Sequence, residues 1–264
     1  MKKILNYTLL LALIVNISSG CSDDYLDTMP TNAVNAATAF GSIENITMIV
    51  NGLALTMDTH ETTYRQGLGG ESGIKIWYGN FTGNSFCSSS NASAYGAGNT
   101  LASGDYHDNA NSDYVSFPWF YYYRLVAGAN SVLPYIDTES GTDAEKHEKQ
   151  WLKAQALTFR AHAFTMLIQL YGYRWTDSNN GATDGIILHL VPTVDPKPLS
   201  TMAETYDQIY TDLDEAINLY KASGWERPSN PQSIGAPNIN VAYAIYARAA
   251  INKLDYAKAI KAHL

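Results

Sequence analysis

The side chains best suited to bind a polar ligand lie close together in the stretch GIKIWYGNFTGN, residues 73–84. Five aromatic or amide residues fall within its last eight positions, without helical spacing: Trp77, Tyr78, Asn80, Phe81 and Asn84. Aromatic faces pack on the C–H groups of sugar rings, and amides exchange hydrogen bonds with sugar hydroxyls. This stretch is therefore a candidate sugar-binding site. In the alternative interpretation, Trp77 and Phe81 anchor an irregular segment to neighbouring helices.

The same part of the chain supplies weaker candidates. Residues 59–116 are dominated by Gly, Ser, Asn and Tyr and show no sustained period of either helix or strand. Long irregular segments inside a compact domain more often bind ligands than fill space. We expect residues 59–116 to form an irregular insertion that presents a ligand, with Arg65, Asp105 and Tyr106 as additional binding residues.

Patterns for other chemistry are incomplete. HETTY, residues 60–64, begins like a zinc-binding helix but has Tyr64 where a second histidine is needed, and the six histidines show no other ligand spacing. GLGGES, residues 67–72, lacks the last glycine of a dinucleotide loop, so we interpret it as loop or surface. Asp105 and Asp108 could form a glycosidase pair, although solvated surface is the commoner role of such carboxylates. We therefore expect no catalysis, metal or cofactor.

The composition and net charge of the chain narrow the classes of protein to which it can belong. The chain has 264 residues, 46% of them apolar and 16% charged, which is enough for a sizeable core. The net charge of -8 provides no basic surface for phosphates, so nucleic-acid binding is not expected. The 19 tyrosines instead predict an uncharged surface with flat rings and hydroxyl groups.

The N-terminus has the layout of an export signal. Residues 1–20 combine Lys2 and Lys3 with an apolar run too short to span a bilayer, followed by small residues. Cys21 comes next, as in a bacterial lipoprotein cleavage box, although Ser18 stands where leucine is usual. We expect cleavage before Cys21, lipidation of its thiol, and a tether over residues 21–36. The alternative is an ordinary signal peptide that leaves Cys21 as a thiol.

The remaining segments predict helices. In 37–58, apolar residues recur every three or four positions, with Ile46 and Leu53 on one face. Similar stripes run through 145–172 and 201–224, the second with Asp212, Asp214 and Glu215 largely on its polar side. Residues 236–264 predict two helices hinged near Leu254 and Asp255, with a tetratricopeptide-like pattern that stops before the stack is complete.

The aromatic run FPWFYYYRLVAGAN, residues 117–130, predicts a packing helix more than a ligand platform. Trp119, Tyr123, Val126 and Asn130 are spaced as one helical stripe, which we expect to face the core. Phe120, Tyr121 and Tyr122 then fall on the flanks and rear of the helix.

Several blocks together resemble the SusD/RagB family of surface glycan-binding lipoproteins. They are CSDDYLDTMPTNAV, WFYYYRLVAGANSVL, KAQALTFRAHAFTMLIQLYG, PLSTMAETYDQIYTDLDEAI and NVAYAIYARAAINKLDYAKAI. Their order and approximate spacing match the family over nearly all of residues 21–264. The chain has about half of the usual family length, so residues 37–264 resemble the N-terminal portion of a family member. The C-terminal half of a full-length member would supply part of the ligand surface.

The resemblance implies an all-α fold of tetratricopeptide-like helix pairs with long irregular insertions. It also implies a lipoprotein on the outer face of the outer membrane, because two acidic residues follow Cys21. Its partner would be a SusC-like TonB-dependent transporter, to which the protein delivers oligosaccharide without catalysis. The family's ligand-binding aromatics favour Trp77, Tyr78 and Asn80. A surface glycoside hydrolase and a helical scaffold that binds only protein are the alternatives.

Overall fold

The computed structural model describes residues 39–58, 70–76, 109, 112–193, 195–227 and 235–261. The chain divides into Met1–Gly41 and Ser42–Leu264, and the helices belong to the second unit. They are α3 (Ile43–Asp58), α4 (Gly70–Ile76), α6 (Asp113–Val132), α7 (Asp143–Tyr171), α8 (Met202–Ser223), α9 (Ile239–Asn252) and α10 (Tyr256–Lys261). The described residues contain no strand beyond one isolated bridge, between Asp184 and Thr201. The predicted all-α class is confirmed.

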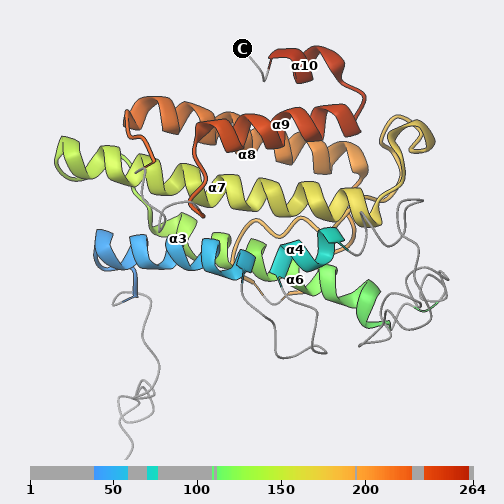
Figure 1. The fold of residues 1–264 in the computed structure, drawn as a ribbon, viewed down its shortest axis with the longest axis horizontal. Helices are drawn as coiled ribbons and strands as arrows, with labels where there is room; N and C mark the ends of the chain where they lie inside the picture. Colours follow the sequence, from blue (N-terminus) through green and yellow to red (C-terminus); the bar gives the residue numbers. More distant parts are fainter. Residues whose placement is uncertain are drawn as a thin grey trace, which may run out of the picture. The chain divides into compact units, whose positions relative to one another are not determined.

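Helix α7 is the centre of the second unit. It packs against α3 and α6 on one side and against α8 and α9 on the other (Figure 1). A helix covered on several sides buries more than one stripe, and nearly every residue from Trp151 to Ile168 is buried. The predicted stripe in this segment is therefore part of a wider buried surface.

The helix ends follow from local chemistry. Thr142 and Glu145 form a capping box at the start of α7, with Thr142 N donating to Glu145 Oε2 at 2.7 Å. Thr201 and Glu204 do the same for α8. Such boxes satisfy backbone N–H groups that have no partner inside the helix. At the other end of α8, Gly224 adopts the left-handed conformation that favours glycine.

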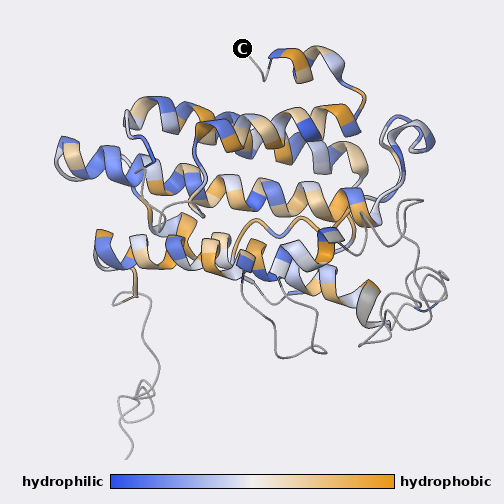
Figure 2. Ribbon diagram, in the orientation of Figure 1, coloured by the Kyte–Doolittle hydropathy of each residue, from blue (hydrophilic) through white to orange (hydrophobic). Residues whose placement is uncertain are grey.

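Helix α3 joins this core through the predicted face. Ile46, Val50 and Leu53 are buried. Figure 2 shows hydrophobic and hydrophilic positions alternating along α3. Gly128 on α6 permits the close approach, because a Cβ there would lie 2.6 Å from Leu53 Cδ2. The sequence prediction of a packing helix in 37–58 is confirmed from Ile43 onwards.

The aromatic run on α6 does fill the core, but the predicted stripe is wrong in detail. Tyr121 and Tyr122 are 3% and 0% exposed, whereas Trp119 and Tyr123 are only half-buried. The reason is that α3 covers Tyr121 and that α4 and α7 cover Tyr122, whereas Trp119 and Tyr123 line a hollow beside the non-helical residues 187–193. The Tyr123 hydroxyl accepts from Ile187 N at 2.8 Å and donates to Ile187 O at 2.9 Å.

Asp212 on α8 also departs from expectation. It is 1% exposed instead of lying on the polar side of the helix. Arg160 of α7 donates Nε to Asp212 Oδ2 at 2.8 Å and Nη2 to Oδ1 at 2.7 Å. Because a buried carboxylate is tolerated when it is paired and hydrogen-bonded, this side of α8 can pack against α7.

The last two helices follow the predicted hinge. Helix α9 ends at Asn252, and α10 begins at Tyr256 after a turn through Lys253–Asp255. Leu254 in this turn has a positive φ of 60°. None of the described helices combines the length and hydropathy that crossing a membrane requires.

Candidate ligand-binding cavity

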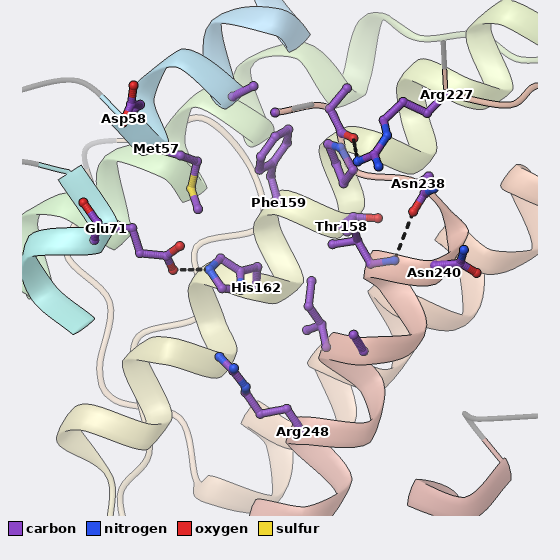
Figure 3. A pocket seen from close by; sticks show the side chains of 18 of the residues that line it. Met57, Asp58, Glu71, Thr158, Phe159, His162, Arg227, Asn238, Asn240 and Arg248 are labelled. Carbon is purple, nitrogen blue, oxygen red and sulfur yellow. Dashed lines mark hydrogen bonds and ion pairs between the residues drawn. The ribbon is translucent and has the colours of Figure 1, made fainter. Parts of the chain in front are cut away.

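A cavity of about 770 Å³ lies between helices α3, α4, α7 and α9 and residues 235–238 (Figure 3). This volume falls in the range of about 300–1,000 Å³ that small-molecule sites occupy. Charged residues of both signs line it, together with amides: Asp58, Glu71, Lys75, His162, Asn238, Asn240 and Arg248. The cavity therefore combines hydrogen-bonding groups with apolar side chains such as Met57 and Ile245.

Helix α4 forms one wall of the cavity, and the contacts of Glu71 hold this helix against α6 and α7. Its carboxylate is bonded to His162 Nε2 of α7, as Figure 3 shows. It also accepts from Tyr122 Oη of α6 at 3.2 Å and from Lys75 Nζ at 2.8 Å. Ile74, which is fully buried, adds an apolar anchor. A helix of seven residues has little stability alone, so these contacts hold α4 in place.

The electrostatics of Glu71 follow from its partners. Burial alone would raise the pKa of its carboxyl group, but hydrogen bonds and positive charge from His162 and Lys75 lower that pKa to about 2. Burial and the neighbouring Glu71 carboxylate raise the pKa of the Tyr122 hydroxyl. Glu71 is therefore ionised at neutral pH, and Tyr122 is a neutral hydrogen-bond donor to it.

This geometry corrects the interpretation of GLGGES as loop or surface. Gly70, Glu71 and Ser72 belong to α4, and Glu71 is 7% exposed. Helix α4 thus lies inside the segment 59–116, in which the sequence showed no helical period. Seven residues are too short for a period to be visible. One local signal was present, because Glu71 and Lys75 are four residues apart, as in a helical ion pair.

Residues 235–238 and helix α9 form the wall of the cavity opposite α4. Pro237 O accepts from Tyr220 Oη at 3.1 Å and from Gln155 Nε2 at 3.3 Å. Asn238 then caps α9 by accepting from Val241 N at 3.2 Å. Arg248 extends from α9 toward α7, and its Nη1 contacts Met166 Sδ at 3.6 Å (Figure 3). Arg248 thus adds a guanidinium group to the lining that contains Glu71.

The described lining contains no exposed aromatic platform. Phe159 is the phenylalanine among the described lining residues, and it is 5% exposed and belongs to the core. Among the described residues there is also no group of three His, Cys, Asp or Glu side chains that could hold a metal ion. The arrangement can bind a ligand rich in hydroxyl or other polar groups.

The predicted site residues lie outside the described residues. This holds for Cys21, Arg65, Trp77, Tyr78, Asn80, Phe81, Asp105 and Tyr106. Trp77 is connected to the cavity through the chain itself. Helix α4, which lines the cavity, ends at Ile76, and Trp77 is the next residue in the sequence.

Sequence reasoning missed Glu71, His162 and Arg248. His162 and Arg248 sit in strongly apolar helical segments, where a single polar residue is ordinarily a satisfied core group, and nothing local relates them to each other. Only the packing of α7 against α4 and α9 brings them to one cavity.

The chain belongs to the SusD-like family, since residues 24–250 match the family model described as starch-binding and associating with the outer membrane. The recognition from the five sequence blocks is thereby confirmed. No match was found among the curated proteins.

Solved structures share the fold. A SusD superfamily protein from Bacteroides thetaiotaomicron matches with a TM-score of 0.62 and 20% identity, over 84% of this chain and 45% of that one. A SusD-like carbohydrate-binding protein from Bacteroides vulgatus matches with a TM-score of 0.65 and 20% identity, over 84% and 44%. The chain thus spans less than half the length of these relatives.

Proposed function

We propose that the protein is a lipoprotein of the outer-membrane surface that binds oligosaccharides and delivers them to a SusC-like TonB-dependent transporter, without catalysis. In this proposal the lipid on Cys21 holds the protein on the membrane, facing the cell exterior. Residues 1–20 are the export signal, and residues 21–36 are the tether.

One observation carries the proposal. The family whose model covers residues 24–250 is described as starch-binding, and in this chain a hydrogen-bonding cavity adjoins the helix that leads directly into WYGNF. The cavity provides polar groups for hydroxyls, and Trp77, Tyr78 and Phe81 would provide the rings that its described lining lacks. Asn80 would add an amide to the same site.

Affinity electrophoresis of the chain from Ser22 tests this proposal. The gels contain soluble starch, xylan, galactomannan, laminarin or inulin, and a matched assay measures released reducing ends. We expect at least one polysaccharide to retard the protein without hydrolysis. Trp77→Ala and Tyr78→Ala should each reduce the apparent affinity about five- to tenfold, because each removes a stacking face worth about 1–1.4 kcal/mol.

Tyr135→Ala is the matched control, since Tyr135 is 45% exposed and does not line the cavity. It should leave retardation unchanged. Release of reducing ends would contradict the proposal in favour of a glycoside hydrolase. Absence of retardation by every polysaccharide would contradict glycan binding by this chain and favour a scaffold that binds protein.

A further inference from the structure

A second hollow, of about 380 Å³, lies at the end of the helices, away from the cavity described above. The C-terminal ends of α7 and α9, residues 172–176 and Tyr206 of α8 form it, and it shares no lining residue with the first cavity. Its volume is within the range of small-ligand sites.

Two aromatic side chains give the hollow flat surfaces. Tyr173 is 62% exposed, so one of its ring faces is open to a ligand. Trp175, two residues later, is half-buried and lines the same hollow. Rings that stay in contact with water at a concave surface can stack on a ligand without unpacking the core.

Trp175 is held in place before any ligand arrives. Its ring meets Tyr206 edge to face at a centroid distance of 5.6 Å. Lys253 Nζ lies 5.2 Å from the indole centroid and 3.2 Å from Asp207 Oδ1, and Lys253 is not part of the hollow's lining. A cation–π contact of this kind fixes the ring from outside the hollow, which lowers the entropy cost of stacking.

A buried polar atom also points to a ligand. Asn252 lines the hollow, and its Nδ2 is buried without a hydrogen-bond partner among the described residues. A buried donor with no acceptor costs about 1–3 kcal/mol, and a ligand oxygen would remove that cost. Among the described residues of the lining, the one cation is Arg174, which is already paired with Asp177 at 2.8 Å. The hollow therefore suits a neutral ligand with hydroxyl groups better than an anion.

We propose that this hollow is a second saccharide site, in which a neutral sugar ring stacks on Tyr173 and Trp175 while one of its hydroxyls accepts from Asn252 Nδ2. The inference rests on the proposed glycan-binding function and adds a site to it. Two sites on one chain raise the affinity for a long glycan when its length lets it reach both.

Fluorine NMR of the full chain labelled with 5-fluorotryptophan tests the two sites separately. The chain has five tryptophans, and single Trp→Phe variants assign their resonances. Maltoheptaose and the hexasaccharides of cellulose, xylan, mannan and laminarin are titrated in turn. We expect a sugar-dependent shift of the Trp175 resonance that persists in Trp77→Ala.

Tyr173→Ala should raise about tenfold the sugar concentration at which the Trp175 resonance has completed half of its shift. The corresponding concentration for the Trp77 resonance should not change. Tyr135→Ala, which removes an exposed tyrosine outside the hollow, should change neither. The resonance of the buried Trp151 reports that each variant is folded.

Each other outcome has a definite meaning. If Trp77 shifts and Trp175 does not, or if Tyr173→Ala has no effect at Trp175, the second site is refuted while the proposed function stands. If only Trp175 shifts, the second site stands and the placement of the first site at Trp77 fails. If no sugar moves either resonance, both the second site and the proposed function are refuted.

Discussion

Two buried polar residues of α7, Arg160 and His162, show how different the two sides of this helix are. They are two positions apart, and a helix turns about 100° per residue, so their side chains leave opposite sides. Arg160 points into a sealed interface with α8, whereas His162 lines the open cavity of about 770 Å³. The same helix thus serves as scaffold on one side and as a wall of the candidate binding site on the other.

The sealed side satisfies its charges completely. Asp212 receives two hydrogen bonds from Arg160 and a third from Gln208 Nε2 at 2.8 Å. Arg160 Nη1 donates to Asn130 Oδ1 at 2.9 Å, and Asn130 Nδ2 donates to His189 O at 2.8 Å. This network connects α6, α7, α8 and the segment after α7.

The open side uses its ion pair differently. His162 and Glu71 connect α7 to α4, a helix of seven residues beside the cavity. Removing a group from the sealed side should therefore damage the whole fold, whereas removing one from the open side should chiefly release α4. Substitutions on each side test this difference.

The largest effect is expected from Asp212→Ala. It leaves the Arg160 guanidinium buried without its carboxylate partner, which typically costs about 3–5 kcal/mol. Urea unfolding followed by circular dichroism measures the loss. Asp214→Ala, on the exposed side of the same helix, is the matched control and should cost less than about 1 kcal/mol. Equal effects of the two substitutions would contradict the sealed network.

A smaller effect, about 2 kcal/mol at pH 7, is expected from Glu71→Gln, which removes the charge that His162 and Lys75 stabilise. The pKa of Glu71 is lowered from 4.5 to about 2 in the fold. A lowered carboxyl pKa contributes stability that is present above about pH 4.5 and is lost as the pH falls through about 2. The stability difference between the native chain and Glu71→Gln should therefore narrow between pH 5 and pH 2.

Lys75→Ala is the control for this pair, because the Lys75 side chain is 47% exposed and its ion pair contributes less, below about 1 kcal/mol. A stability difference between the native chain and Glu71→Gln that stays constant over the acidic range would show that Glu71 does not titrate as an ion-paired buried group.

The long helices could be predicted because each carries its own periodic signal. Ile46 and Leu53 on α3 are examples, and the hinge at Leu254–Asp255 follows from a local turn. The capping boxes at Thr142 and Thr201, which the sequence analysis did not use, are T-x-x-E motifs before apolar runs. Local chemistry of this kind does not depend on what the helix later packs against.

The cavity could not be predicted in this way. Asp212 was assigned to the polar side of α8 because helical spacing shows an average face and cannot show a partner such as Arg160 on another helix. Glu71 was assigned to a loop because α4 is too short for a period. Both residues depend on contacts with α7 across 52 and 91 positions of the sequence.

Hydrogen–deuterium exchange of the full chain, with and without an oligosaccharide of the glycan that retards it, tests the central claim most directly. If the glycan binds on the open side of α7, peptides covering residues 70–81 and the α9 residues around Arg248 will exchange more slowly when it is present. The peptides around Asp212 will be unchanged. Glycan binding that leaves residues 70–81 and the Arg248 region unprotected would contradict the account.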